Sequence, residues 1–163
     1  NPRAHYEGTG PEILHDLPQT TAFVAGLGTG GTLTGTGRYL KEQNPDIRII
    51  AVAPHPGENV QGLRALEDGF IPEIFDESVL DGKITVNSLT SFAVTKQLAD
   101  QEGVFAGVSS GSVIHAGLKA ADRLEGEQHI VCLLADGGWK YLSSGLWTQT
   151  WESSDELDSQ VWW

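Results

Sequence analysis

The residues best suited to binding chemistry lie in a loop of glycines and threonines. Gly28-Thr29-Gly30-Gly31-Thr32 follows an apolar run at residues 22–25 and precedes a helix-forming run that begins at Arg38. At such a strand-loop-helix junction, backbone N–H groups and the positive end of a helix dipole act together on an anion. Threonine hydroxyls add donors that carry no net charge. These five residues therefore predict a binding site for a phosphate group.

The same loop also satisfies the G-x-G-x-x-G pattern of dinucleotide-binding folds. That pattern needs an acidic residue about 20 positions further on, at the end of the next strand, to bind a ribose hydroxyl. Here the next apolar run ends in Val-Ala-Pro-His at residues 52–55, and Glu58 comes only after two prolines. A P-loop would need a Gly-Lys pair, which this loop lacks. A phosphomonoester is therefore favoured, with a dinucleotide as the weaker alternative.

Two other polar residues follow apolar runs. Ser109 comes after residues 104–108, and Asp136 comes after residues 129–135. If these runs are parallel strands, both residues lie with Gly28 at the carboxyl edge of the sheet, where ligands bind in open α/β folds. On residue type alone, Ser109 could equally cap a helix, and Asp136 could equally serve a turn.

The elements that must position these residues alternate between strands and helices. We expect strands at residues 21–25, 47–53, 83–86 and 129–135, and a further strand-turn-helix junction after the apolar run at 104–108. Helices are expected at residues 10–17, from the glycine loop to about 44, at 89–101 and at 112–124. This order predicts an α/β fold with a mostly parallel twisted sheet and helices on both faces. The irregular stretch of residues 54–82 is of a length that is often functional.

The net charge and the length of the chain limit the classes of partner that we expect for it. The 163 residues carry a formal net charge of −12, which argues against nucleic acid and against an anionic membrane surface. The length suits one domain with a sizeable core. No apolar run approaches the length of a membrane span, and no secretion signal is visible. We therefore expect a cytoplasmic protein without nucleic-acid or membrane partners.

The thiol and imidazole groups predict no metal site. Cys132 is the single cysteine, which excludes an internal disulfide and a cysteine-based zinc site. It lies in an apolar run, so we expect a buried structural thiol. The five histidines show no spacing with a carboxylate that is typical of metal ligands.

Four blocks of the sequence resemble the pyridoxal-phosphate-dependent cysteine synthase family. They are the glycine loop, Gly-Val-Ser-Ser-Gly at residues 107–111, Lys-Tyr-Leu-Ser-Ser at 140–144, and His-Tyr-Glu-Gly-Thr-Gly-Pro-Glu-Ile at 5–13. Their order and spacing resemble the C-terminal half of these fold type II enzymes over residues 1–148. An acidic tail that ends in two tryptophans follows at 149–163. The lack of any methionine, together with a start at Asn1, also leads us to expect part of a longer polypeptide.

The resemblance implies pyridoxal 5′-phosphate as the cofactor. Residues 28–32 would bind its 5′-phosphate, and Ser109 would hydrogen-bond its pyridine nitrogen. A hydroxyl partner leaves that nitrogen largely unprotonated, which favours β-elimination and replacement. The family's Schiff-base lysine and its loop for the substrate carboxylate lie in the preceding half, and no residue here matches them. Lys140 matches a basic position that does not form the Schiff base, so we predict no catalytic residue in this chain.

Residues 61–63 and 69–72 resemble the substrate-cleft loop of the family, with Gly62 as a binding residue. The chain departs from the commonest version by Arg64 and by three extra residues between Gly62 and Phe70. A guanidinium in a cleft suits an anionic leaving group. This feature resembles the actinobacterial branch that uses O-phosphoserine rather than O-acetylserine. An arginine on a solvated loop is the alternative.

The activity that the resemblance implies for the full-length protein is β-replacement. O-phosphoserine or O-acetylserine would give an aminoacrylate, to which a sulfur nucleophile adds to form cysteine. The expected partners are the amino-acid substrate, sulfide or a sulfur-carrier protein, the missing N-terminal half, and a second copy in a homodimer. A truncated, non-catalytic homologue that binds or regulates a partner through its acidic tail is the alternative. We also hypothesise that residues 161–163 fold back over the cleft and shield a reactive intermediate.

Overall fold

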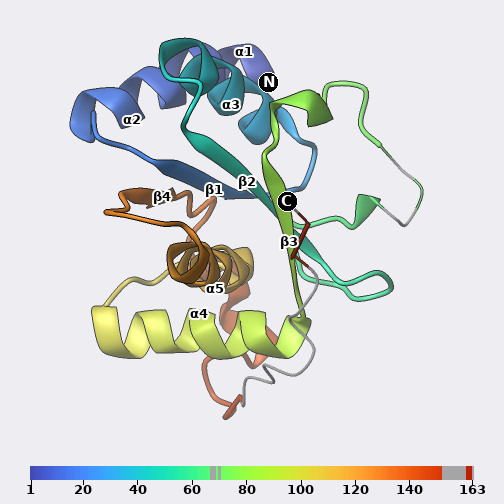
Figure 1. The fold of residues 1–163 in the computed structure, drawn as a ribbon. Helices are drawn as coiled ribbons and strands as arrows, with labels where there is room; N and C mark the ends of the chain where they lie inside the picture. Colours follow the sequence, from blue (N-terminus) through green and yellow to red (C-terminus); the bar gives the residue numbers. More distant parts are fainter. Residues whose placement is uncertain (67–68, 70, 152–160, 163) are drawn as a thin grey trace.

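The computed structural model describes residues 1–66, 69, 71–151 and 161–162, and its centre is a twisted sheet (Figure 1). The strand order is β4-β1-β2-β3-β5. The first four strands run parallel, and β5 runs antiparallel to β3. The strands are β1 (Ala22–Gly26), β2 (Arg48–Pro54), β3 (Gly82–Val86), β4 (Ile130–Cys132) and β5 (Val161–Trp162).

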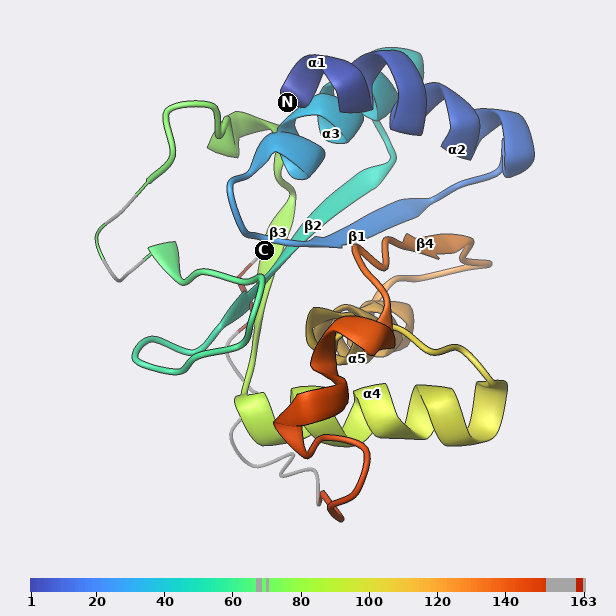
Figure 2. The same cartoon turned by 180° about the vertical axis from the view of Figure 1, so that it is seen from behind.

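Helices cover both faces of this sheet, as the two opposite views show (Figures 1 and 2). One face carries α1 (Pro2–Ala4), the π-helical turn η1 (His5–Thr9), α2 (Gly10–Asp16) and α3 (Gly31–Gln43). On the other face α5 (Val108–Arg123) lies against the strands, and α4 (Ser88–Glu102) packs outside α5. The 3-10 segments η3 (Glu77–Val79) and η4 (Gly138–Ser144) lie in the connections. The predicted α/β fold is confirmed.

Alternate residues of the central strands enter two separate cores. Phe23 and Ile49 pack with Leu33 of α3 on one side, whereas Val24 and Ile50 pack with α5 on the other. All five of these side chains are fully buried. Because the strands are covered on both faces, they read as continuous apolar runs in the sequence.

The structure differs from the prediction around Ser109. Residues 104–108 form no strand; Ala106 makes one isolated bridge to Gly137. Helix α5 begins at Val108 instead of residue 112, with Gly107 as its N-cap. Ser109 therefore lies in the first turn of a helix, and the apolar side chain of Phe105 stays 42% exposed. An apolar run of five residues does not by itself distinguish a strand from the approach to a helix.

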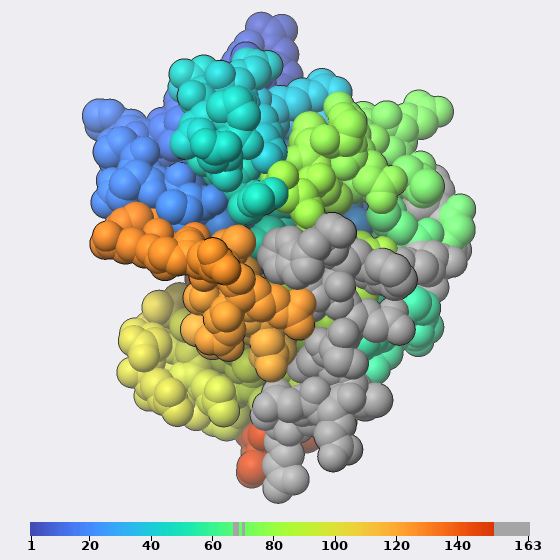
Figure 3. Space-filling view, in the orientation of Figure 1, coloured from blue at the N-terminus to red at the C-terminus, as the bar shows by residue number. Residues whose placement is uncertain are grey.

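Strand β4 is shorter than the expected 129–135, and it lies at an edge of the sheet. Among the described strands it pairs only with β1, and its segment lies at the surface (orange in Figure 3). Cys132 is consequently half-buried, where the sequence predicted full burial. Its Sγ faces α5 and would be 2.5 Å from a Cβ at Gly117, so the thiol has a packing role.

The start of the predicted tail packs on the main body. Trp151 stacks edge-on against Phe92 of α4 with ring centroids 4.9 Å apart, and its Nε1–H donates to Leu146 O at 2.9 Å. Strand β5 pairs with Lys83 and Ile84, close to the amino end of β3. Residues 152–160 and Trp163, on which the tail hypothesis also depends, lie outside the described residues. None of the described helices is long and apolar enough to cross a membrane.

Candidate functional site

A cavity of about 810 Å³ opens where β1 and β2 end. It is lined by the loop after β1, the end of β2 and the segment that follows it, and by Ala135 after β4. The structure brings all the predicted phosphate-loop residues together with both predicted substrate residues in this one cavity. The lining residues are Gly26, Gly28, Thr29, Gly30, Gly31, Thr32, Pro54, Glu58, Asn59, Val60, Gly62, Leu63, Arg64, Ala65 and Ala135.

The loop after β1 delivers the amino end of α3 to the cavity. Gly30 has φ +81°, a left-handed conformation that favours glycine, and a Cβ there would lie 2.5 Å from the Phe75 ring. Within the part of the chain that the structure describes, α3 has no side-chain N-cap hydrogen bond. The first N–H groups of a helix have no intrahelical partner. The amino end of α3 is thus suited to an anion, together with the Thr29 and Thr32 hydroxyls.

Gly62 lies between this loop and Ser109. A Cβ on Gly28 would be 2.8 Å from Gly62 O, and a Cβ on Gly62 would be 3.7 Å from Ser109 Oγ. Gly62 also has φ +92°, a conformation that favours glycine. Ser109 is 6% exposed and is not among the described residues that line the cavity. The structure places Ser109 beside the site, next to Gly62, and not in the cavity wall.

Helix α4 holds the first turn of α5, a feature that sequence reasoning missed. Ser91 Oγ and Thr95 Oγ1 lie 2.8 and 3.0 Å from Val108 O, and both donate to it. Thr95 Oγ1 accepts the Gly111 N–H at 3.1 Å. The two backbones are so close that a Cβ on Gly111 would come within 1.9 Å of Ser91 O. The i,i+4 spacing of Ser91 and Thr95 was the available signal, since it places both hydroxyls on one helix face.

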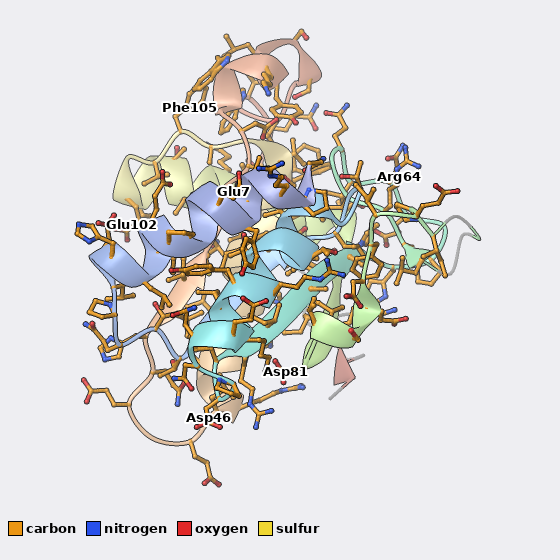
Figure 4. The ribbon with its side chains drawn as sticks, turned by 90° about the horizontal axis from the view of Figure 1, so that it is seen from above. Glu7, Asp46, Arg64, Asp81, Glu102 and Phe105 are labelled. Carbon is orange, nitrogen blue, oxygen red and sulfur yellow. The ribbon has the colours of Figure 1, made fainter. Side chains whose placement is uncertain are left out.

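The segment after β2 is hydrogen-bonded to the glycine loop. Arg64 N donates to Leu27 O, and Leu27 N donates to Val52 O, each at 2.7 Å. Leu63 lies over Gly26, where a Cβ would be only 2.5 Å from Leu63 Cδ2. Arg64 lines the cavity, but its side chain is exposed and lies at the edge of the molecule (Figure 4). Arg64 thus lies where the cavity meets the exposed surface.

Glu58, the alternative to a ribose-binding acid, already has a structural role. Its Oε2 accepts the N–H of Ser88 at 2.5 Å, at the amino end of α4. A carboxylate is favourable at that position because it opposes the helix dipole. This contact weakens the dinucleotide alternative.

Asp136 and Lys140 belong to a neighbouring region. Tyr141 donates its hydroxyl to Asp136 Oδ2 at 2.8 Å, and Lys140 Nζ lies 3.5 Å from the same oxygen. Burial, together with this hydrogen bond, raises the pKa of Tyr141 to about 12. Asp136 O accepts the N–H of Gly107, the residue before α5, at 2.8 Å. The structure thus gives Asp136 the role of fixing the entry to α5.

Within the described residues, lysines and groups of metal-binding side chains do not gather at the cavity. No lysine is among the described residues that line it. Over the same described residues, no group of three or more histidine, cysteine, aspartate or glutamate side chains is placed to hold a metal ion. The chemistry that these walls offer is hydrogen bonding to an anion, with one arginine at the edge.

A family model described as "Pyridoxal-phosphate dependent enzyme" matches residues 1–136. The chain belongs to this family. It is 39% identical to cysteine synthase B of Pseudomonas aeruginosa over 148 residues, which are 90% of this chain and 49% of that protein. It is 40% identical to a probable cysteine synthase of Bacillus subtilis, with 91% of this chain and 51% of that protein covered.

Solved structures are also similar to this chain. Cysteine synthase from Entamoeba histolytica superposes with a TM-score of 0.85 at 32% identity, over 94% of this chain and 48% of that one. O-ureido-L-serine synthase gives a TM-score of 0.83 at 34% identity, over 95% and 52% of the two chains. The chain therefore spans about half the length of the relatives it matches.

Proposed function

We propose that this chain is the part of a cysteine synthase that binds the phosphate of pyridoxal 5′-phosphate. The observation that carries the proposal is the cavity of about 810 Å³ in which residues 28–32 meet Gly62 and Arg64. The residues fit a phosphate: the close approach of Gly28 to Gly62 leaves no room for a Cβ, and the amino end of α3 faces the cavity. Membership of the pyridoxal-phosphate-dependent family supports the same ligand.

We assign roles to individual residues from their positions and, for Ser109, from the resemblance to the family. Residues 28–32 would bind the 5′-phosphate through backbone N–H groups and the hydroxyls of Thr29 and Thr32. Ser109 would be the partner of the pyridine nitrogen, held in place by the contact of α4 with the first turn of α5. When bound, the cofactor supplies an electron-withdrawing ring that allows the leaving group of an activated serine to depart. Gly62 and Arg64 would face that substrate.

For the substrate, we favour O-phosphoserine over O-acetylserine. Arg64 at the cavity edge offers a planar pair of donors that matches a phosphate better than a neutral acetyl ester. With sulfide as the nucleophile, the reaction would convert O-phosphoserine and sulfide into cysteine and phosphate. A sulfur-carrier protein is the other possible donor.

The lysine that this reaction needs would come from another segment. The described cavity lining contains no lysine, and the chain covers 49% of the length of the Pseudomonas relative. We assign the lysine to an N-terminal half of the enzyme, either on the same polypeptide or on a separate one. The resemblance also predicts a homodimer, which light scattering of the complete enzyme would test.

Complementation tests the proposed function directly. The chain would be mixed with the separately produced lysine-bearing half of the Bacillus subtilis relative, and cysteine formation would be assayed from each activated serine with sulfide. Activity is expected only in the mixture. Arg64→Ala should reduce the use of O-phosphoserine far more than that of O-acetylserine, whereas Arg123→Ala, at the far end of α5, should change neither. Equal losses on both substrates would refute the O-phosphoserine assignment.

The absence of lysine from the described cavity lining also supports a second candidate, a non-catalytic binding or regulatory homologue. Such a protein would still bind the phosphate but would not complement a lysine-bearing half. Its signature would be a change in the activity of an intact cysteine synthase when the chain is added. Complementation without any such effect would rule this candidate out.

A further inference from the structure

A smaller cavity lies beside the cavity of about 810 Å³, which we call the main cavity. The smaller one has a volume of about 160 Å³, and Asn59 lines both. Val108 of α5 and Leu146, which follows η4, are buried residues that line it. The half-buried rings of Phe92 and Trp151 add aromatic walls, with their centroids 4.9 Å apart. We call this smaller cavity the aromatic pocket.

The lining of the aromatic pocket suits a neutral ring. None of the described residues that line it carries a charge, and the whole chain has a formal net charge of −12. An anion would therefore lose its hydration without gaining a cationic partner. Trp151 Nε1–H already donates to Leu146 O at 2.9 Å, so the indole offers the pocket its ring and no free donor. Aromatic rings pack favourably against other rings in offset or edge-to-face arrangements.

The volume and the polar groups of the pocket define the ligand further. An engineered apolar cavity of about 150 Å³ binds benzene, so a pocket of about 160 Å³ has room for one ring. Asn59 and Gln61 line the pocket and are exposed, so their amides are the polar groups that a ligand meets toward solvent. Small-molecule sites commonly combine apolar walls with a few polar groups that fix the orientation of the ligand. These features match a single aromatic ring that carries one uncharged polar group.

The aromatic pocket is directly connected to residues assigned to the main site. Its lining residue Val108 precedes Ser109, and its lining residue Gln61 precedes Gly62. Val60, which precedes Gln61, is fully buried and packs in one apolar cluster with Val108. A ligand that contacts both Gln61 and Val108 would hold the segment after β2 against α5. That is the arrangement in which Gly62 lies beside Ser109.

We propose that the aromatic pocket is a regulatory site: it binds a small neutral aromatic molecule and thereby strengthens ligand binding in the main cavity. The ring of this molecule lies against Phe92 and Trp151, and its polar group lies at the amides of Asn59 and Gln61. The regulatory effect rests on the proposed function, since it concerns a phosphorylated ligand in the main cavity. Binding of the aromatic molecule itself does not depend on that function.

Titration of the chain with benzamide, followed by ligand-observed nuclear magnetic resonance, tests the binding site. Benzamide has one ring and one uncharged amide, and we expect a Kd on the order of 1 mM or lower. Benzoate differs from it by a negative charge and should bind at least about tenfold more weakly. Cyclohexanecarboxamide keeps the amide but has no aromatic ring, and it should bind about threefold more weakly. Equal affinities for the three compounds, or no binding of benzamide, would overturn the proposal.

Substitutions of tryptophan place the bound benzamide. Trp151→Ala should weaken its binding at least about tenfold because one aromatic wall is lost, whereas Trp151→Phe should keep most of the affinity. Trp139→Ala is the control, since Trp139 is 65% exposed and does not line the pocket. Thermal unfolding without ligand shows whether each variant is folded. Full affinity in Trp151→Ala would overturn the assignment of the ligand to this pocket.

The regulatory effect is tested with pyridoxamine 5′-phosphate, which has the phosphate but no aldehyde to react with surface lysines. Saturating benzamide should increase the affinity of the chain for this compound about fivefold or more, and bound pyridoxamine 5′-phosphate should increase the affinity for benzamide by the same factor. Binding of benzamide without this coupling would overturn the regulatory role and leave the proposed function intact. Failure of the chain to bind pyridoxamine 5′-phosphate at all would overturn the proposed function and the regulatory role with it.

Discussion

The α-carbon of Gly28 lies against the carbonyl group of Gly62, so that a Cβ on residue 28 would be 2.8 Å from Gly62 O. The two residues come from different connections, one after β1 and the other after β2. Both residues line the cavity, and a Cβ on Gly62 would be 3.7 Å from Ser109 Oγ. A single close backbone approach therefore links the three groups of residues assigned to the site.

Gly28→Ala is expected to separate these two loops. Something must shift to relieve the 2.8 Å contact with backbone, and overpacking of this kind typically costs about 1–3 kcal/mol in unfolding free energy. Binding of pyridoxamine 5′-phosphate, followed by calorimetry, should weaken by more than about tenfold, which is about 1.4 kcal/mol.

Gly8→Ala is the matched control for this substitution. Gly8 lies in the η1 turn, and a Cβ there would meet nothing within 4 Å. Alanine should be neutral or slightly stabilising at that position because glycine is the poorer helix former. Similar affinity losses in Gly28→Ala and Gly8→Ala would show that the contact with Gly62 does not shape the site.

Much of this fold could be predicted from local patterns. Apolar runs covered on both faces mark β1 and β2, and the glycine loop followed by a helix former marks the junction with α3. The site residues that share one loop, Gly28 to Thr32, were found for the same reason: their chemistry and their position come from consecutive residues. The strand-loop-helix rule needs no information about distant parts of the chain.

The remaining features depend on contacts between distant segments. At the end of residues 104–108 the chain enters α5, and Ser91 and Thr95 of α4 bind Val108 O there. The half-exposure of Cys132 depends on β4 being an edge strand. His5 reaches Thr32 only because Gly35 has no side chain. The spacing of Ser91 and Thr95 places both hydroxyls on one helix face, but no short stretch of sequence names the partner segment in any of these three relationships.

Thr95→Val should loosen the junction between α4 and α5. The substitution keeps the shape of the side chain but removes a buried hydroxyl that contacts Ser91 O, Val108 O and the N–H of Gly111. Leaving buried polar groups without partners costs about 1–3 kcal/mol each, so we expect urea denaturation to show a loss of that order. Thr148→Val, at an exposed hydroxyl, should change the midpoint little. Equal midpoints for the two variants would contradict this account of how Ser109 is positioned.

Cys132 should react slowly with thiol reagents in the folded chain. Burial raises the pKa of its thiol to about 11, against about 8.5 for an exposed cysteine. Because the thiolate is the reactive form, its rate of disulfide exchange with an aromatic disulfide at pH 8 should be about a hundredfold or more below that of the urea-unfolded chain. The chain has one cysteine, so the signal needs no assignment. Comparable rates in the two states would show that the thiol is open to solvent.

The Cys132 thiol should also make the unfolding free energy depend on pH. Its pKa is higher in the folded chain than in the unfolded one, so the unfolded state releases the proton first as the pH rises. The contribution is fully present below about pH 8.5 and is lost as the pH approaches about 11. Cys132→Ala should flatten the fall in unfolding free energy over this range, while Ser143→Ala, an exposed residue, should leave its slope unchanged.

Tyr141 is expected to titrate well above an ordinary tyrosine. Burial and its hydrogen bond to Asp136 raise its pKa to about 12, and the hydrogen bond to Glu42 also raises the pKa of Tyr6. Of the three tyrosines of the chain, we expect Tyr141 to give the last step in the ultraviolet absorbance of the phenolate. Tyr141→Phe should remove that step, and circular dichroism at the same pH would show that the fold persists.

The Tyr141 hydroxyl is also linked indirectly to Ser109. It donates to the carboxylate of Asp136, and the backbone carbonyl of Asp136 accepts the N–H of Gly107, where the chain enters α5. Loss of the hydroxyl leaves Asp136 Oδ2 with the Lys140 ammonium at 3.5 Å as its partner among the described residues, so we expect a cost of about 1 kcal/mol in unfolding free energy. Tyr6→Phe provides the comparison, since the Tyr6 hydroxyl bonds Glu42 at the exposed surface. If Tyr141→Phe is no less stable than Tyr6→Phe, the Tyr141–Asp136 bond does not fix the start of α5, and the positioning of Ser109 then depends on α4 alone.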